Sequence, residues 1–423
     1  MLRTSKRVRV NKSALAAAIL GAMAAAAPFS AALAQQDKEV QRAEQATQQQ
    51  SQQTFSTGGM RWAFKPYVES EAGYDSNPDN SFDEDGTSLL KLEAGFKATA
   101  ETESEFYKLA VRGRFIDYHD LPEDIRHRTD FRASLDTTFV LSKSETLYAG
   151  TYFLRDLISL ARADIGNSYL EYALKKDDFR VKLQAKSHVE HNFDNDSQLA
   201  GESFDNFSVS RARAFDYARS DGQINVLTFT RSWLQPFAIF DYGNINYYNQ
   251  VAGASIDRDA NEFYAIGGIR LQPASNFRID AGYRYNYRDM DDQNFSQEEK
   301  GYIDLNVFWK PIDTLKVTGI VERHFDEPSS SFGIVEDVKS YGTVVDWDFA
   351  RDWRLTATGF YDREETVGVD RLDKKYTGTL AVTHYTSQNM EVFLSTLFKH
   401  VEEDFTGDSY NRYKVGAGVR LKF

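Results

Sequence analysis

The sequence contains no cysteine among its 423 residues. This absence excludes disulfide bonds, thiolate metal sites, a cysteine nucleophile and a lipid-modified N-terminal cysteine. The mean hydropathy is −0.53, and no apolar run outside the N-terminus reaches the roughly 20 residues that a membrane-spanning helix needs. Acidic residues outnumber basic ones by 63 to 50, so the chain lacks the positive charge that a nucleic-acid partner requires.

The apolar stretch at the N-terminus has the three parts of a secretory signal peptide. It opens with five basic residues and no acidic one: Arg3, Lys6, Arg7, Arg9 and Lys12. A mostly alanine core follows over residues 14–27, and Ala32 and Ala34 supply the small residues that a signal peptidase reads. We expect residues 1–34 to be removed on export. A retained membrane anchor is the weaker alternative, because the apolar core is short.

Residues 35–59 are rich in glutamine and carry few apolar side chains. Such a segment buries too little surface to offset the entropy lost on ordering, so we expect a short flexible periplasmic tail. A short helix over residues 37–53 is the alternative, because Glu, Gln, Lys and Ala are good helix formers.

Residues 60–423 alternate apolar and polar side chains in one long segment after another. Phe277 and Ile279, for example, alternate with Arg278 and Asp280. A period of two places the two sets on opposite faces of a strand. The segments exceed the five or six residues usual in soluble sheets and reach the roughly 9 to 11 residues of a tilted membrane-crossing strand. One face is apolar throughout and the other carries charge at its middle, which predicts an all-β transmembrane antiparallel barrel.

The connections between these segments alternate in length and give the strand count. Short turns are expected at residues 100–104, 142–145, 175–178, 233–236, 273–276, 311–314, 351–352 and 386–388. Long polar connections are expected at residues 75–86, 120–128, 157–164, 195–217, 249–260, 290–298, 327–336, 366–371 and 403–409. These connections imply about 18 strands, with 16 as the alternative. Residues 202–215 also alternate, but an extra strand would make the number odd. Short turns belong in the periplasm, so both mature termini are expected there.

Aromatic residues mark the expected ends of the strands. All five tryptophans fall near predicted short turns: Trp62, Trp233, Trp309, Trp347 and Trp353. Indole rings prefer the headgroup level of a membrane. The last segment alternates up to a terminal phenylalanine, and Tyr413, Val419, Leu421 and Phe423 form its apolar row. Such an ending is similar to the C-terminal signal by which outer-membrane barrels are recognised for assembly, which implies the barrel-assembly machinery as a partner.

Residues 66–78 read PYVESEAGYDSNP. They resemble the opening of the putative beta-barrel porin 2 family. Phe215-Asp216-Tyr217 and Pro236-Phe237 look like mid-chain landmarks of the same family. The resemblance implies a barrel in the cell outer membrane of a Gram-negative bacterium. Because several members accompany exopolysaccharide export systems, it also implies a role as the outer-membrane exit. It carries over no catalytic residues.

Catalytic and metal-binding patterns are weak. The seven histidines are scattered, and His188 and His191 are three apart, which places them on opposite faces of a strand. Residues 75–86 begin like a calcium loop, but Asn80 and Gly86 replace the glycine and glutamate that such a loop needs. No nucleophile elbow or phosphate-binding glycine loop occurs. We therefore expect no enzyme, no catalytic residue, no metal and no cofactor.

The polar face of the strands supplies the candidate functional residues. Charges on that face must be hydrated or paired. The expected pore-lining residues are Glu69, Glu71, Lys91, Glu93, Arg112, Arg114, Arg132, Arg180, Lys182, Lys186, Arg278, Arg284, Arg288, Lys414 and Arg420. Two interpretations remain open: a wet channel of mixed charge, favoured because 18 strands leave an aqueous bore, or an interior plugged by ion pairs.

The sequence favours a passive outer-membrane conduit. The exported substrate, a secreted polysaccharide, is implied by the family resemblance, as is a periplasmic polysaccharide-export protein as partner. Outer-membrane lipid and lipopolysaccharide are the expected surroundings of the barrel. A general or solute-specific diffusion porin is the first alternative, and a structural or adhesive barrel with partner-binding outer loops is the second.

Overall fold

The computed structural model describes residues 53–57, 59–78, 86–121, 126–156, 162–193, 217–247, 257–291, 297–326, 335–367, 371–403 and 408–423. The expected signal peptide, the glutamine-rich segment up to residue 52 and residues 194–216 lie outside this part of the chain. Within it, no helix has the length and apolar character needed to cross a membrane.

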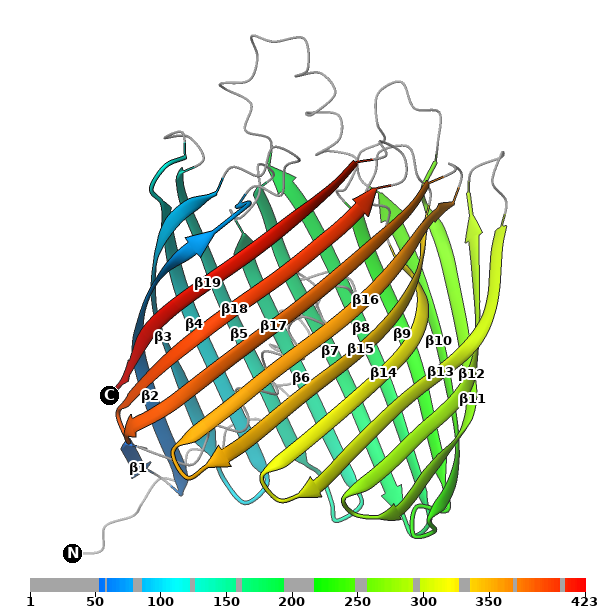
Figure 1. The fold of residues 1–423 in the computed structure, drawn as a ribbon. Helices are drawn as coiled ribbons and strands as arrows, with labels where there is room; N and C mark the ends of the chain where they lie inside the picture. The colour runs from blue at the N-terminus through cyan, green and yellow to red at the C-terminus, as the bar shows by residue number, and fades with distance from the viewer. Residues whose placement is uncertain are drawn as a thin grey trace, which may run out of the picture.

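The described part of the chain is built from 19 β-strands (Figure 1). Their bounds are β1 Gln53–Thr57, β2 Met60–Asp75, β3 Thr87–Glu101, β4 Glu105–Tyr118, β5 His127–Val140, β6 Glu145–Asp156, β7 Arg162–Lys176, β8 Phe179–Phe193, β9 Tyr217–Thr228, β10 Leu234–Tyr247, β11 Ala260–Ala274, β12 Phe277–Met290, β13 Gln297–Ile312, β14 Leu315–Asp326, β15 Val335–Ala350, β16 Trp353–Val367, β17 Arg371–Ser387, β18 Met390–Glu403 and β19 Asp408–Lys422.

Strands β2 to β19 form a closed antiparallel barrel of 18 strands, which confirms the predicted fold class and strand count. Each strand pairs with the next along the chain, and β19 pairs with β2 from Lys414↔Asp75 to Lys422↔Tyr67. Because the number of strands is even, the start of β2 and the end of β19 lie at the same rim, at the lower left of Figure 1.

Strand β1 lies outside the ring and pairs with β2 alone, from Gln53↔Phe64 to Thr57↔Met60. It occupies the same edge of β2 as β19, whose pairing with β2 stops at Tyr67. The five-residue strand therefore covers edge groups of β2 that β19 is too short to reach. Gly59 permits the tight turn with a φ of 83°. The flexible tail expected over residues 35–59 thus contains a strand near its end.

The two faces of each strand differ in polarity as the alternation predicts, and the charged face is the hidden one. In β2, Glu69 and Glu71 are 3% and 4% exposed. Val68, which lies on the opposite face of the strand, is 47% exposed. A soluble protein shows the reverse arrangement, because water favours charge outside and apolar groups inside. Charge inside and apolar side chains outside fit a barrel surrounded by lipid.

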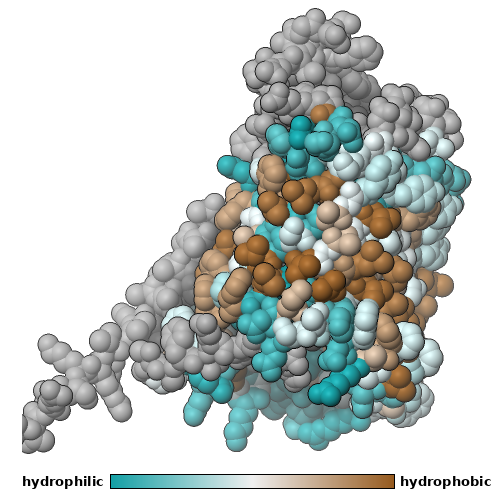
Figure 2. Space-filling view, turned by 60° about the vertical axis from the view of Figure 1, so that its left-hand side comes forward, coloured by the Kyte–Doolittle hydropathy of each residue, from teal (hydrophilic) through white to brown (hydrophobic). Residues whose placement is uncertain are grey.

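The outer face carries the expected band of apolar residues. Figure 2 shows hydrophobic residues across the middle of one side of the barrel and hydrophilic residues below them. All five tryptophans lie at or beside strand ends at the short-turn rim: Trp62, Trp233, Trp309, Trp347 and Trp353. Each is between 38% and 61% exposed, which suits a ring at the headgroup level.

Seven of the eight short turns fall where the sequence predicts them, within a few residues. The exception joins β9 to β10: the expected turn at residues 233–236 lies instead between Thr228 and Leu234. Pro236, a residue typical of turns, belongs to β10 and pairs with Ile269. The β9–β10 ladder begins only at the next residue, Phe237↔Leu227. Proline is tolerated there because no ladder bond to β9 requires its missing N–H.

The barrel wall is incomplete between β13 and β14. Their ladder runs from Leu305↔Val321 to Trp309↔Val317, with one further pair at the turn. Residues 297–304 of β13 and 322–326 of β14 are strand residues, but no backbone pair joins these two segments. In Figure 1 the two yellow strands lie together below and diverge above. We call this opening the β13–β14 seam.

Side chains partly cover the seam. The Arg323 guanidinium on β14 lies 4.4 Å from the centre of the Tyr302 ring on β13. The same guanidinium is paired with the Asp337 carboxylate on β15. Unpaired strand edges within a membrane need protein or water beside them, and this stacked ion pair places protein there.

Candidate functional site: the inner wall of the barrel

The inner face of the barrel wall is the candidate functional surface. The ladder register places all the expected pore-lining residues on this one face: Glu69, Glu71, Lys91, Glu93, Arg112, Arg114, Arg132, Arg180, Lys182, Lys186, Arg278, Arg284, Arg288, Lys414 and Arg420. They do not form one cluster. Ion pairs join most of them into separate networks, each fixed by the register of neighbouring strands.

The first network lies across the barrel closure. Glu69 of β2 accepts hydrogen bonds from Lys91 of β3, at 2.7 Å, and from Arg420 of β19, at 2.5 Å. Lys91 also bridges to Glu71 at 2.5 Å. On β18, Glu391 lies 3.3 Å from Arg420. Alternating charges thus join four consecutive strands, including the first and last strands of the ring.

A glycine on β19 leaves the space that the Glu71 side chain of this network occupies. Ser395 of β18 donates a hydrogen bond to Glu71 of β2 at 3.0 Å, although β19 lies between the two strands. Gly416 of β19 stands in the gap, and a Cβ atom there would collide with the Glu71 carboxylate. The missing side chain at Gly416 therefore allows Glu71 to lie flat along the wall.

The same chain of charges continues into β4 and β5. Glu93 of β3 accepts a hydrogen bond from the Tyr67 hydroxyl at 2.9 Å and lies 3.7 Å from Arg112. Arg112 and Arg114 of β4 both pair with Asp130 of β5. The Asp130 side chain is 1% exposed, so the two guanidinium groups supply the compensation that a buried carboxylate needs.

A second group of ion pairs lies on β9 to β13. Arg219 of β9 pairs with Glu262 of β11 at 2.9 Å, and Arg288 of β12 lies 3.6 Å from the same carboxylate. Nearer the middle of the wall, Arg284 of β12 pairs with Asp304 of β13 at 2.6 Å. Residues 278 and 280 of β12 pair with each other at 3.3 Å. Much of this wall is therefore neutralised locally.

The inner wall between these networks has a different character. Strands β6 and β7 carry Tyr148, Tyr152 and Tyr169 on their inner face, where Tyr169 stands opposite Gly150 and Tyr152 opposite Asn167. The Tyr169 hydroxyl donates to Asp136 at 3.1 Å. The guanidinium of Arg132 lies 5.3 Å from the centre of the Tyr152 ring. We call Tyr148, Tyr169 and Tyr152 the tyrosine ladder.

The remaining expected residues are less involved in ion pairs. Lys182 pairs with Glu171 at 2.7 Å, and Lys186 lies 3.9 Å from Asp241. Within the described part of the chain, no carboxylate lies within ion-pair distance of Arg180 or Lys414. Lys414 nevertheless interacts electrostatically with Glu71 and Asp75 on the neighbouring strand.

Most of the acidic partners of these cations are not among the residues expected from the sequence. Asp130, Asp241, Glu262, Asp304 and Glu391 all lie on the inner face, and each except Asp304 is at most 5% exposed. Their alternation with apolar residues is visible in the sequence and assigns them the same face as the cations. What the sequence does not show is register, which decides which acid meets which base.

His188 and the C-terminal row have defined places in the wall. His188 faces inward and stacks on Tyr217 with ring centroids 4.5 Å apart. Among the described residues, no three His, Asp or Glu side chains are grouped to hold a metal ion. The row expected to act in assembly, Tyr413, Val419, Leu421 and Phe423, lies on or directly after β19. The Phe423 amide donates to the Pro66 carbonyl at 3.0 Å.

A ring of 18 antiparallel strands with a charged interior is the architecture of an outer-membrane barrel. The family model of putative beta-barrel porin 2 matches residues 55–423. The chain belongs to this family. It is therefore an outer-membrane β-barrel of the porin type, as the resemblance of residues 66–78 implies. No curated protein matches the sequence.

Solved structures with a similar fold include several outer-membrane proteins. The outer membrane protein opdK from Pseudomonas aeruginosa has 11% identity and a TM-score of 0.45, covering 85% of this chain and 99% of its own. The FrpB iron transporter from Neisseria meningitidis has 8% identity and a TM-score of 0.45, covering 85% and 81%. A bacterial polysaccharide outer membrane secretin has 9% identity and a TM-score of 0.34, covering 85% and 98%.

Proposed function

We propose that this barrel is a passive conduit through which a secreted polysaccharide leaves the cell across the outer membrane. The observation that supports the proposal is the tyrosine ladder on the inner wall. Tyr148, Tyr169 and Tyr152 occupy successive inward rows of the paired strands β6 and β7. Rows two residues apart are separated by about 6.6 Å along a strand, so the three rings extend along the direction of passage.

The chemistry of the ladder suits sugars. The C–H faces of a pyranose pack on aromatic rings, and tyrosine adds a hydroxyl that can donate and accept. Asn167 and Gln184 share the inner face of β7 and β8 and offer amide groups at the same level. A polymer with many hydroxyls can exchange such contacts from one row to the next without a strong preference for any single position.

The ladder is placed away from the densest ion pairing. On β18, β19, β2 and β3, the inner charges neutralise one another within hydrogen-bond distance. Charges held in this way stiffen the wall but offer few groups to a passing solute. We therefore assign the contacts with polymer to the wall formed by β6 to β8, with the periplasmic export partner at the short-turn rim.

Single-channel recording of the refolded chain 35–423 in a planar bilayer tests the proposal. We expect a steady conductance that is reduced when a soluble polysaccharide is added on the short-turn side. The triple variant Tyr148→Ala, Tyr152→Ala, Tyr169→Ala is expected to lose most of this block. The matched control Tyr283→Ala, Tyr285→Ala, Tyr287→Ala removes three tyrosines from the outer face of β12 and should keep it.

Each result separates the alternatives. Conductance without block by polysaccharide indicates a diffusion porin. Silence of the full chain, with conductance after removal of residues 195–216, indicates a conduit that this connection closes. Silence of both forms overturns the conduit and leaves a structural or adhesive barrel.

A further inference from the structure

Three cations line up on the outer face of the barrel, across β15, β16 and β17. Lys339 stands directly opposite Arg363, and Arg363 stands directly opposite Lys374. They share the face of Tyr341 and Tyr376, which are 48% and 37% exposed. Like charges directly opposite each other destabilise a sheet unless an anion lies between them. We call Lys339, Arg363 and Lys374 the basic row.

The basic row is poorly neutralised by the protein. Lys374 pairs with Glu402 at 2.7 Å, but both side chains are about 40% exposed, and such surface pairs contribute little. In the described part of the chain, no carboxylate lies within ion-pair distance of Lys339 or Arg363. The Arg363 Nε atom is buried and lacks a hydrogen-bond partner among the described residues.

Other charged groups near the long-connection end of the outer face are already satisfied. Arg126 pairs with Asp117 at 2.7 Å, and Arg155 pairs with Asp164 at 2.6 Å. The Glu299 carboxylate accepts a hydrogen bond from the Tyr285 hydroxyl at 2.7 Å. Asp337 and Glu365 also act on Lys339, but Asp337 is paired with Arg323 of β14, which stands directly opposite Lys339. With Arg323 included, four cations on β14 to β17 meet three carboxylates, Asp337, Glu365 and Glu402, so this part of the described outer surface keeps a positive charge.

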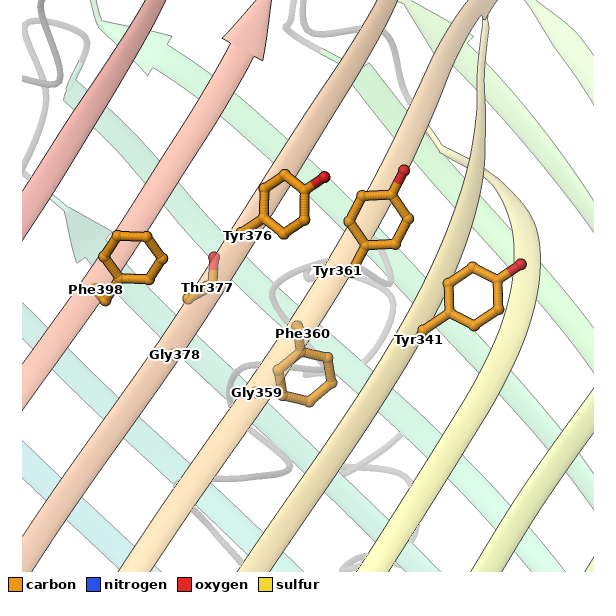
Figure 3. A pocket seen from close by; sticks show the side chains of 8 residues that line it. All are labelled: Tyr341, Gly359, Phe360, Tyr361, Tyr376, Thr377, Gly378 and Phe398. Carbon is orange, nitrogen blue, oxygen red and sulfur yellow. The ribbon is translucent and has the colours of Figure 1, made fainter.

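A row of aromatic rings follows directly below the basic row. Tyr341, Tyr361 and Tyr376 stand opposite one another on the same three strands, with ring centroids 6.0 and 4.8 Å apart. His400 of β18 extends the row, 5.8 Å from Tyr376. Figure 3 shows the three phenol rings side by side on the wall. Tyrosine rings favour the interface between headgroups and acyl chains.

Below the rings the wall is hollowed. Gly359 and Gly378 face each other across β16 and β17, and Phe398 of β18 forms one side of the hollow. The groove has a volume of about 340 Å³. It opens on the lipid-facing side of the wall, so hydrocarbon is the medium beside it.

We propose that this surface is a binding site for a phosphorylated glycolipid of the outer leaflet, the class to which lipopolysaccharide belongs. The phosphate lies against the basic row, the sugar ring and acyl carbonyls lie at the level of the phenols, and an acyl chain fills the groove over Gly359 and Gly378. Strands lie about 4.8 Å apart, so the row extends over roughly 10 Å, enough to hold a headgroup by more than one cation.

The chemistry of the groups and their order argue for this occupant. Cations, then phenols, then an apolar hollow follow one another from the long-connection end of the strands toward the middle of the wall. A lipid has its phosphate, its polar linkages and its hydrocarbon in the same order. A soluble anion would require the basic row alone, and a second copy of the barrel would not supply phosphate. The proposal depends on the long connections facing outward, but not on the conduit function.

Native mass spectrometry of the refolded chain 35–423, released from detergent micelles, measures retained lipid. The probes are a diphosphorylated lipid A, phosphatidylglycerol and phosphatidylcholine. We expect lipid A to be retained at least tenfold more tightly than phosphatidylcholine, with phosphatidylglycerol between them. The variant Lys339→Gln, Arg363→Gln, Lys374→Gln should lose at least tenfold in affinity for lipid A.

Two further variants complete the test. Lys143→Gln, Lys175→Gln, Lys176→Gln removes three exposed cations at short turns and should bind lipid A as the unmodified chain does. Gly378→Val fills the groove and leaves every charge in place. A Cβ atom at this position meets no neighbour closer than 3.8 Å, so the barrel should fold. It is expected to weaken lipid A binding severalfold.

The outcomes are distinct. Equal retention of all three lipids overturns the site, as does equal binding by the basic-row variant and the short-turn variant. Equal retention of lipid A and phosphatidylglycerol overturns the glycolipid as the occupant. Folding of every variant is checked by its migration on gels with and without heating. Since the basic row faces outward, its removal should leave single-channel conductance unchanged.

Discussion

Removal of the Glu69 charge tests whether the inner ion pairs hold the barrel closed. The Glu69 side chain is 3% exposed and is shared by Lys91, at 2.7 Å, and Arg420, at 2.5 Å. Loss of one member of a buried ion pair costs about 3 to 5 kcal/mol, because the remaining charge stays buried. In the variant, Lys91 is still paired with Glu71 and Arg420 is still paired with Glu391. We therefore expect Glu69→Gln to lower the free energy of unfolding by about 3 kcal/mol, at the low end of this range.

The measurement is urea unfolding in phospholipid vesicles, followed by the gel migration of folded and unfolded chains. The matched control is Glu101→Gln, whose pair with Arg61 has side chains 40% and 73% exposed. Such an exposed pair contributes at most about 1 kcal/mol. Combining Glu69→Gln with Lys91→Met should cost less than the sum of the two single changes, because the pair between these two residues is then lost only once. Equal unfolding free energies for Glu69→Gln and the control would refute the argument.

Two further predictions concern the seam and a carboxyl group at the long-connection rim. Because the chain has no cysteine, Ile303→Cys with Arg323→Cys introduces a single thiol pair across the seam. We expect little disulfide on oxidation, whereas Leu305→Cys with Val321→Cys, in the intact ladder, should cross-link readily, and equal yields would contradict an open seam. Burial, aided by nearby carboxylates, raises the pKa of Asp259 above its usual 3.8. Stability from this group is greatest below that value and falls as pH rises through the folded pKa. Asp259→Asn should therefore gain stability relative to the unmodified chain between pH 4 and pH 7 in parallel urea titrations.

Much of the fold is readable from the sequence because a lipid-facing strand obeys a strict rule. Each residue faces either lipid or the interior, so a period of two survives along the whole chain. Residues 277–288 show this rule without interruption, and β12 is found there. The count of 18 follows from the turns, since a short turn between two long alternating segments has few alternative positions. Strand β1 escaped prediction because its five residues pair only where β19 ends, a feature of closure and not of local sequence.

The inner site is less readable, because it depends on register. Alternation assigns Arg284 and Asp304 to the interior but does not reveal that they form an ion pair between β12 and β13. A shift of one ladder position would turn every side chain of a strand to the other face, and a shift of two would exchange its partners. The seam is a further case. Residues 297–304 alternate like any other strand, and only the absence of pairs with β14 sets them apart.

The distribution of charge around the wall relates stability to transport. Ion pairs are densest where β19 meets β2, which is where a closed sheet made from one chain must join its ends. If all the inner charges formed such pairs, none would be available to contact a solute. The inner face of β6 to β8 carries tyrosines and amides beside the cations Arg180, Lys182 and Lys186, and no carboxylate of the described residues lies within ion-pair distance of Arg180. The connection between β8 and β9, residues 194–216, is the longest between described strands and arises from the same side. We therefore expect selection among solutes to depend on that side of the barrel, and substitutions at the closure to change its unfolding free energy while leaving selectivity unaltered.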